Sequence, residues 1–230
     1  MNKNIPNLLL VEGNNDKSFF ERVCKKYNIN ADIKVSTPVD FIPPAQGGFN
    51  SKQGVINSLE TFLPMLEDED AVIKKIAIII DSDVASENNG GFTNTIELIK
   101  EKTSRYDYSQ RHRYINGGVE IPHNDSQMNP LGIWIMPNNR DEGTIENWIQ
   151  DKIIDSERDV FTYACSIVSK LENKKFSQSS TAKAEIATWL AWQNQPGRTL
   201  AYTLKDGAEL IDINNSGFKD FVKWLSGFAV

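Results

Sequence analysis

The chain has 230 residues, of which 40% are hydrophobic and 24% are charged, and its net charge is −6. This composition is that of an ordinary globular protein with a substantial core, and no apolar segment approaches the ~20 residues that cross a membrane. The acidic balance argues against a protein that holds nucleic acid by bulk electrostatics alone. The two histidines and two distant cysteines lack the spacing of a zinc ribbon, and no signal-peptide pattern is visible, so we expect a cytoplasmic protein.

Strands and helices alternate in the first part of the chain. We predict strands over 7–12, 32–36, 75–80 and 131–136, and helices over 16–27, 55–66 and 93–102. The strand segments are short apolar runs, which are typical of strands buried on both faces of a parallel sheet. Residues 103–130 show no periodicity, and we interpret them as an irregular excursion with room for one short strand, such as a functional lid.

The second part of the chain reads as helix throughout. The apolar spacing predicts helices over 143–153, 156–171, 179–193 and 217–227, with Trp189, Trp192 and Trp224 on core faces. We therefore expect an α/β fold with a mostly parallel, Rossmann-like sheet flanked by helices over residues 1–153. Residues 154–230 are expected to form a helical C-terminal extension packed on that core.

Acidic residues follow two of the predicted strands directly. Glu12 and Asp16 come after the first strand, and Asp81 and Asp83 come after the strand over 75–80. Ligands of open parallel sheets sit outside the carboxyl ends of the strands, and residues i and i+2 of an extended segment face the same side. Carboxylates so close repel one another unless a cation lies between them, and their hard oxygen atoms suit Mg²⁺ or Mn²⁺.

Each of these acids also has a purely structural interpretation. Asp16 can cap the following helix, Glu12 can be a solvated strand end, and the Asp81–Asp83 pair can be a polar loop. Glu146 follows the strand over 131–136 and can be either a metal ligand or an acid that favours the first turn of a helix.

Three arginines are candidates for phosphate binding. Arg111, Arg113 and Arg140 lie in segments that could reach the crevice at the strand ends. The alternative is that they are ordinary solvated loop residues.

These motifs resemble the TOPRIM family, the catalytic fold of topoisomerases, bacterial primases, ribosomal-RNA maturation nucleases and OLD-type nucleases. Its pattern is Glu-Gly after the first strand and Asp-x-Asp after a later one, matched here by Glu12-Gly13 and Asp81-Ser82-Asp83, with Gly47-Gly48 after the second strand. Asp16 and the segment around Glu146 are more similar to the OLD-type subset. Residues 136–146 and 190–197 resemble a family of small stand-alone TOPRIM-like proteins of unassigned function. Ser86 stands where the usual motif has glycine.

The resemblance implies Mg²⁺- or Mn²⁺-dependent hydrolysis of phosphodiester bonds in DNA or RNA. It assigns catalysis to Glu12, Asp81 and Asp83, and metal binding to Glu12, Asp16, Asp81, Asp83 and Glu146. The chain contains no Gly-x-x-x-x-Gly-Lys-Ser/Thr motif. An ATPase such as the one that accompanies OLD-type nucleases would therefore be a partner protein acting in trans.

Two other functions stay open at this point. A non-catalytic TOPRIM-like regulatory or interaction partner would keep the acids as an inherited scaffold, and the acidic net charge favours it. A haloacid-dehalogenase-like phosphatase also uses Asp-x-Asp after a strand, with the first Asp as nucleophile. Its motif has Thr or Val where Ala85 stands, and Glu12 would have no role in it.

Overall fold

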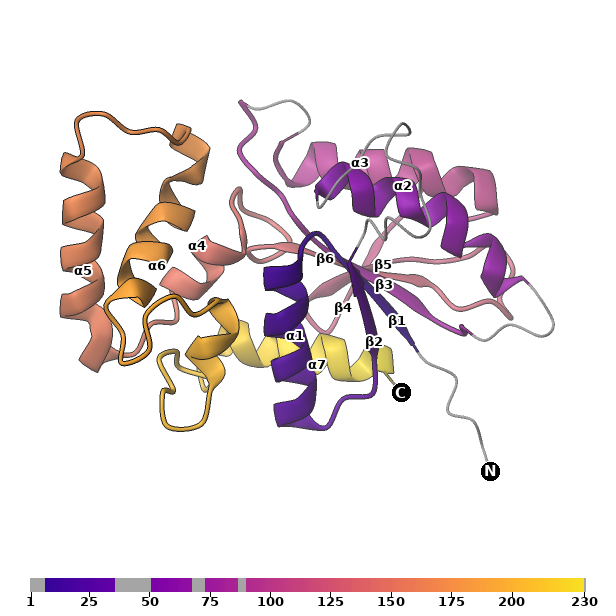
Figure 1. Ribbon diagram of the computed structural model, residues 1–230. Helices are drawn as coiled ribbons and strands as arrows, with labels where there is room; N and C mark the ends of the chain where they lie inside the picture. The colour runs from indigo at the N-terminus through magenta and orange to yellow at the C-terminus, as the bar shows by residue number, and fades with distance from the viewer. Residues whose placement is uncertain (1–6, 36–50, 68–72, 87–89, 230) are drawn as a thin grey trace.

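The protein is an α/β fold in which a six-stranded sheet lies between two layers of helices (Figure 1). The architecture is that of a computed structural model, which describes residues 7–35, 51–67, 73–86 and 90–229. The Gly47-Gly48 pair of the expected motif lies outside the described residues. The expected Rossmann-like α/β class is confirmed.

The sheet has the strand order β2-β1-β3-β6-β5-β4. Its first four strands are parallel, and the last two form an antiparallel hairpin on one edge. The strands span Asp32–Val35 (β2), Leu8–Val11 (β1), Ile76–Asp81 (β3), Leu131–Met136 (β6), Gly118–Ile121 (β5) and Arg113–Ile115 (β4). Because β1, β3 and β6 are parallel neighbours, their carboxyl ends meet at one edge of the sheet.

Helices cover both faces of the sheet because alternate strand residues point to opposite sides. Leu8 and Leu10 of β1 face the cluster beneath α2 (Lys52–Phe62) and α3 (Phe92–Thr103). Leu9 and Val11 face the cluster beneath α1 (Asn14–Tyr27) and α7 (Ser216–Ala229). Strands covered on both faces need apolar residues at every position, which explains the continuous apolar runs in the sequence.

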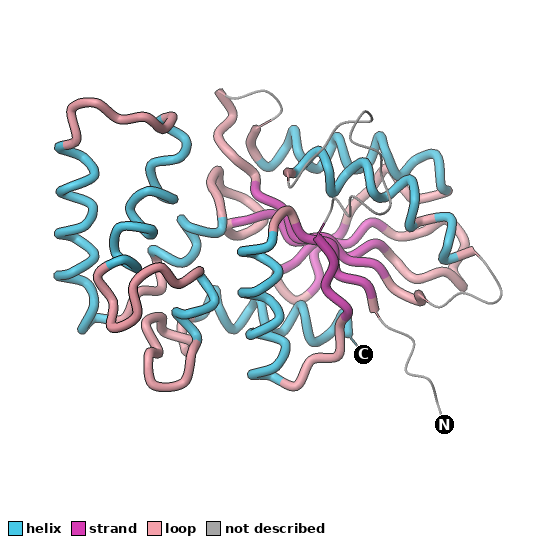
Figure 2. Tube along the Cα trace, in the orientation of Figure 1, coloured by secondary structure: helices cyan, strands magenta, loops and turns pink. Residues whose placement is uncertain are grey.

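The remaining helices lie to one side of the sheet, at the left of Figures 1 and 2. They are α4 (Ile145–Gln150), α5 (Asp155–Lys170) and α6 (Thr181–Ala191). Short 3₁₀ segments lie elsewhere along the chain as well: Pro64–Leu66 (η2) follows α2, Ser104–Tyr106 (η3) follows α3, Gln178–Ser180 (η4) precedes α6, and Leu200–Leu204 (η5) follows α6. Within the described part of the chain, no helix is long and apolar enough to cross a membrane.

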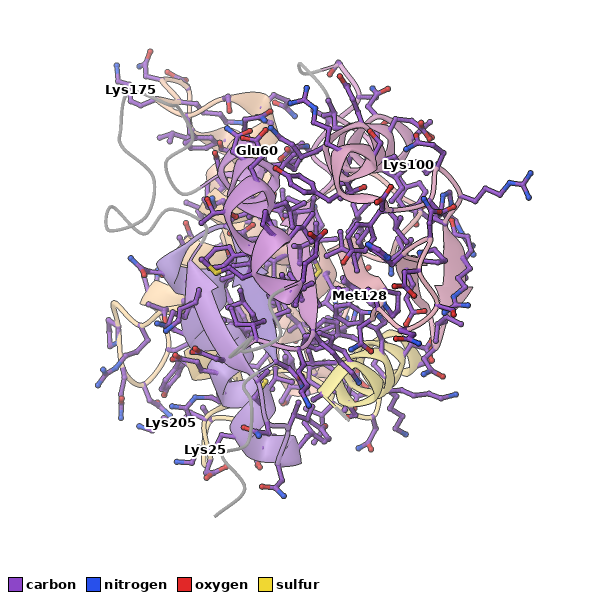
Figure 3. The ribbon with its side chains drawn as sticks, turned by 90° about the vertical axis from the view of Figure 1, so that its right-hand side faces the viewer. Lys25, Glu60, Lys100, Met128, Lys175 and Lys205 are labelled. Atoms are coloured by element: carbon purple, nitrogen blue, oxygen red, sulfur yellow. The ribbon has the colours of Figure 1, made fainter. Side chains whose placement is uncertain are left out.

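Aromatic side chains join α7 to α4 and to the sheet. Trp148 of α4 stacks on Phe218 with ring centroids 5.3 Å apart, and Trp134 of β6 meets Phe221 at 5.1 Å. One buried cluster thus contains residues of β1 near the start of the chain and of α7 near its end. The division of the chain at residue 153 stays a prediction. Figure 3 shows Lys25, Lys175 and Lys205 at the periphery of this packed centre.

Residues 103–130 differ from the expected irregular lid, because they contain the β4–β5 hairpin that continues the sheet. Asn116 and Gly117 form its turn with positive φ angles of 53° and 84°. Two successive left-handed residues suit the twist of a two-residue hairpin, and Asn-Gly is the sequence pattern that favours them.

Trp192 is a second departure from the sequence-based expectation. Trp189 and Trp224 are buried as predicted, but Trp192 is 43% exposed. The reason is that α6 ends at Ala191, so the helical spacing that placed Trp192 on the core face does not extend to it. Its ring instead contacts that of Tyr163 at the surface, with centroids 5.6 Å apart.

Candidate functional site

Glu12 and Asp81 meet at the carboxyl ends of β1 and β3. The two strands pair in register through Val11 and Ile79, and Glu12 follows β1 directly. One oxygen of its side chain, Oε1, accepts a hydrogen bond of 2.8 Å from the backbone N–H of Asp81. The acid after the first strand therefore contacts the acid that ends the third.

The loop after β6 lies beside Glu12 and Asp81, at the same carboxyl ends of the parallel strands. Asp81 Oδ1 accepts a hydrogen bond of 2.9 Å from the backbone N–H of Ile145, the first residue of α4. Ser82 is fully buried, and its hydroxyl accepts a hydrogen bond of 2.9 Å from Gly143 N–H. These bonds join the Asp81–Asp83 segment to the segment that carries Glu146.

Asp83 takes a backbone conformation that the sequence did not indicate. Its φ is +58°, in the left-handed region that Asp tolerates better than most residues. Simple alternation along an extended strand therefore does not set the direction of its side chain. Two backbone hydrogen bonds with Gly143, of 3.0 and 3.2 Å, hold it in place instead.

Lys52 is a site residue that sequence reasoning missed. Its ammonium group forms an ion pair of 2.5 Å with Asp83 and donates a hydrogen bond of 3.0 Å to the carbonyl oxygen of Ser82. The side chain is only 12% exposed. The available signal was its position as the first residue of α2, because a cation is unfavourable at the positive end of a helix dipole unless an acid lies nearby.

Asp16 and Glu146 form the second part of the cluster. Asp16 Oδ2 accepts a hydrogen bond of 2.9 Å from Gly13 N–H. Because α1 begins at Asn14, Asp16 is its third residue and supports the start of the helix from within, whereas the N-terminal cap expected at Asp16 is at Gly13. Glu146 is 5% exposed and accepts a hydrogen bond of 2.8 Å from the hydroxyl of Thr144. Burial, and after it the negative charge of Glu146, raise the pKa of Asp16.

The protein environment raises the pKa values of three of the carboxylates, Glu12, Asp16 and Asp81. Burial, together with the charges of Asp83 and Asp16, raises the pKa of Glu12 to about 8, although the Asp81 N–H bond and Lys52 oppose this rise. Burial and Glu146 raise the pKa of Asp16 to about 6. The pKa of Asp81 is raised well above its usual value by burial and by Glu12. A nearby cation would reverse these shifts, since it stabilises the ionised forms.

The donor set fits a hard divalent cation by its chemistry, because all five acids offer carboxylate oxygen. Among the described residues, no three acidic, histidine or cysteine side chains are arranged as a ready-made metal cage. Three of the acids instead accept hydrogen bonds from backbone N–H groups: Glu12 from Asp81, Asp81 from Ile145 and Asp16 from Gly13. These bonds are compatible with a metal ion, because a carboxylate has two oxygen atoms and several acceptor sites.

The expected phosphate-binding arginines do not gather around the acids. Arg113 lies on the outermost strand, β4, and its guanidinium is 3.1 Å from the carboxylate of Glu120 on β5. Arg111 precedes the same strand and is exposed. The hairpin explains this placement, because it carries both residues to the edge of the sheet. Arg140 is exposed in the turn after β6, at the end of that strand where the acids lie.

A family comparison covers nearly all of these elements, since the family's model matches residues 6–229. The chain belongs to the family described as protein of unknown function (DUF3226). No curated protein matches the chain, and no solved structure matches it.

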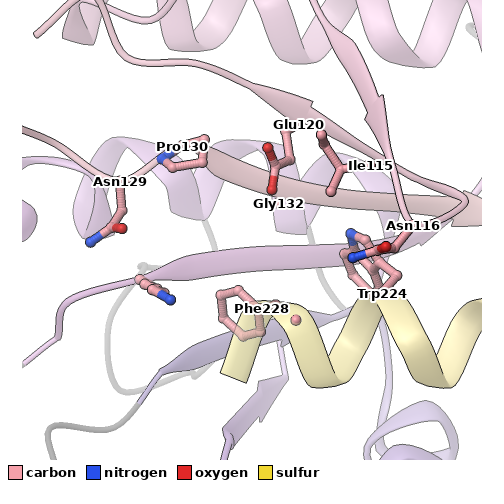
Figure 4. Close-up of a pocket in the computed structure, with 10 residues that line it drawn as sticks. Ile115, Asn116, Glu120, Asn129, Pro130, Gly132, Trp224 and Phe228 are labelled. Carbon is pink, nitrogen blue, oxygen red and sulfur yellow. The ribbon is translucent and has the colours of Figure 1, made fainter. Parts of the chain in front are cut away.

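A separate hollow of about 100 Å³ in this DUF3226 protein lies between α7 and the β4–β5 hairpin (Figure 4). Trp224 and Phe228 line it from α7, and Ile115 and Asn116 line it from the hairpin. Glu120 is the one carboxylate among its described lining residues, and Arg113 neutralises it. The acids at the ends of β1 and β3 therefore remain the better candidate for chemistry.

Proposed function

We propose that this protein is a TOPRIM-type nuclease that hydrolyses phosphodiester bonds in nucleic acid with Mg²⁺ or Mn²⁺. The observation that carries the proposal is the hydrogen bond from Asp81 N–H to Glu12 Oε1, because it joins the acids that follow two parallel strands. The similarity of Glu12-Gly13 and Asp81-Ser82-Asp83 to the TOPRIM pattern supports it.

Asp81 and Asp83 would hold the metal ion, with Glu12, Asp16 and Glu146 as further ligands. The raised pKa values of Glu12, Asp16 and Asp81 support this assignment, since acids packed so closely ionise together only when a cation compensates them. A bound divalent ion would polarise the phosphate and lower the pKa of a water molecule.

Glu12 is suited to proton transfer. Its pKa is raised to about 8 without a metal ion, and a bound cation would lower it, so the ionised side chain can then accept the proton of the attacking water as a general base. The ammonium group of Lys52 lies beside Asp83, where it would stabilise the negative charge that develops on the phosphate.

A cleavage screen tests the proposal. Single-stranded and double-stranded DNA and RNA are incubated with Mn²⁺ or Mg²⁺ and the wild-type chain, Glu12→Gln or Asp81→Asn. Glu172→Gln is the matched control, because it removes an acid from the exposed loop after α5. We expect cleavage by the wild type and the control. Glu12→Gln should lose at least ~100-fold, as is usual when a general acid or base is removed, and Asp81→Asn should lose activity because it removes a metal ligand. Equal activity in all four proteins would contradict the proposal, as would no cleavage of any substrate.

A second candidate is a non-catalytic TOPRIM-like regulatory or interaction partner, for instance of an ATPase. The ion pair between Lys52 and Asp83 favours it, because it neutralises one acid without a metal ion. Melting temperature separates the two candidates. A nuclease site is stabilised by Mn²⁺ and loses this stabilisation in Asp83→Asn, whereas an inherited scaffold melts at the same temperature with and without the metal.

The haloacid-dehalogenase-like alternative is less well supported, because its motif has Thr or Val where Ala85 stands and it gives Glu12 no role. Asp81, the nucleophile it would need, uses its Oδ1 atom to accept the Ile145 N–H. An assay on small phosphomonoesters tests this alternative separately.

A further inference from the structure

A cavity of about 210 Å³ lies between α1 and the segment that joins α6 to η5. These elements are packed side by side (Figure 1). Three of the described lining residues are cationic and none is acidic; the lining consists of Arg22, Gln195, Arg198, Thr199, Ala201, Tyr202 and Lys205. The concentration of positive charge is unusual in a chain whose net charge is −6. A general excess of basic residues therefore does not explain this local positive charge, whereas binding of an anionic ligand would.

Two of the cations converge on one oxygen atom. Gln195 Oε1 accepts hydrogen bonds from Arg198 Nε at 3.1 Å and from Lys205 Nζ at 3.3 Å. A neutral amide oxygen thus occupies a position between two positive groups. An anionic oxygen would bind there more strongly, because a hydrogen bond between two charged partners is about twice as strong as one between neutral groups.

The turn Pro196-Gly197 builds this arrangement. It separates Gln195 from Arg198 by two residues, with Gly197 at a positive φ of 78°. Proline followed by a left-handed glycine is the usual composition of a tight turn. The turn lies in the segment over 190–197 that resembles the small TOPRIM-like proteins, and the carboxylate site does not use it.

The positive charge of the cavity is not neutralised by neighbouring acids. In the part of the chain that the structure describes, no carboxylate oxygen lies within 4.0 Å of a side-chain nitrogen of Arg22, Arg198 or Lys205. Arginine cannot lose its proton in a protein. Arg22 and Lys205 are also half-buried, which strengthens their interaction with an anion relative to fully solvated groups.

We propose that this cavity is a phosphate-binding site. Three cationic side chains, with the planar fork of arginine among them, match the several oxygen atoms and the charge of a phosphate group. The group can come from free phosphate or from the backbone of a nucleic acid strand, and the experiment distinguishes these sources. The proposal does not depend on catalysis by the carboxylates.

The test measures binding of two probes in the presence of EDTA, so that the carboxylate site takes no part through a metal. Inorganic phosphate is titrated by calorimetry, and a labelled single-stranded oligonucleotide is titrated by fluorescence anisotropy. We expect Arg198→Gln and Lys205→Gln each to weaken binding by about tenfold or more, since each removes a hydrogen bond to a charged group. Lys174→Gln, in the exposed loop after α5, is the control of equal charge change.

Each outcome decides the matter. If the two cavity variants bind phosphate more weakly but bind the oligonucleotide as the wild type does, the cavity is a site for a free anion. If they bind both probes more weakly, the cavity contacts the backbone of the nucleic acid. Absence of wild-type binding to both probes would overturn the proposal, and so would wild-type affinity in both cavity variants or an equal loss in Lys174→Gln. Asp81→Asn should bind phosphate as the wild type does, so a failure of the nuclease proposal leaves this result unchanged.

Discussion

Helix α1 connects two regions of opposite charge, the carboxylate site and the basic cavity, which differ in whether their side chains can change protonation state. Asp16 in its first turn belongs to the carboxylate site, and Arg22, six residues later, lines the basic cavity. The carboxylates can take up protons, and burial raises the pKa values of Glu12 and Asp16. The arginines of the cavity cannot lose theirs. The carboxylate site thus needs a cation to become fully ionised, whereas the arginines of the basic cavity stay charged whether or not an anion is bound.

The two regions also differ in how deeply the elements that carry them are packed into the core. Residues of α4, which carries Glu146, pack deep in the aromatic core through Trp148. The cavity is shaped by a turn at the surface, in which Arg198 is exposed. Substitutions should therefore affect global stability at the first region and local geometry at the second.

The largest expected effect comes from removing the support of the carboxylate site. Trp148→Ala deletes a fully buried ring that contacts Phe19, Phe218 and Phe221. We expect the free energy of unfolding to fall by about 3–5 kcal/mol, measured by urea denaturation. Trp192→Ala is the matched control, because the same change at a 43% exposed ring should cost far less. Equal losses would refute the assignment of Trp148 to the core.

The second effect concerns pH. Because the folded-state pKa values of Glu12 and Asp16 are raised to about 8 and about 6, their contribution to stability is fully present at low pH. It is lost as the pH rises through these values. In EDTA, the free energy of unfolding should fall by about 1–3 kcal/mol between pH 5 and pH 8, since one pKa unit corresponds to ~1.4 kcal/mol and solvent screening reduces it.

Glu12→Gln should flatten this pH dependence, and saturating Mn²⁺ should do the same in the wild type. Denaturation curves at a series of pH values provide the measurement. A metal-free wild type that grows more stable between pH 5 and pH 8 would contradict the raised pKa values. The basic cavity contributes nothing to this dependence, so Arg198→Gln should leave the slope as it is.

The smallest effect is expected at the turn of the cavity. Gly197→Ala places a side chain at a φ of 78°, where L-residues are strained, although the site is otherwise open. We expect a loss of about 1 kcal/mol together with weaker phosphate binding. Gly207→Ala is a close control, because its φ is 81° and it is equally open. Gly207→Ala should lose a similar amount of stability and keep its phosphate binding. If Gly197→Ala also kept its phosphate binding, the turn would have no role in shaping the cavity.

The sequence predicted the parts of the fold that depend on local pattern. Continuous apolar runs located β1, β3 and β6, and the residues that follow two of them located Glu12 and the Asp81–Asp83 segment. The β4–β5 hairpin was not predicted, although Asn116-Gly117 is a known turn signal, because its flanking strands are short and β4 is exposed.

Residues that act through tertiary contacts were the ones that sequence reasoning did not find. Lys52 reaches Asp83 across 31 positions of the chain, and Arg22 lines the same cavity as Arg198 and Lys205 because α1 packs beside η5. Arg113 was expected near the acids, but its distance from them follows from hairpin pairing. Such placements depend on topology, and neither spacing nor composition specifies them.

Calorimetric titration with Mn²⁺ tests the central claim that Glu12 and the acids after β3 form one cation site. The wild type should bind Mn²⁺ at pH 7 and release a proton from Glu12, seen as a binding heat that depends on the ionisation enthalpy of the buffer. Glu12→Gln should lose the proton release, and Asp83→Asn should bind at least ~10-fold more weakly, whereas Glu172→Gln should match the wild type. Absence of binding, or identical binding by all four proteins, would contradict the claim.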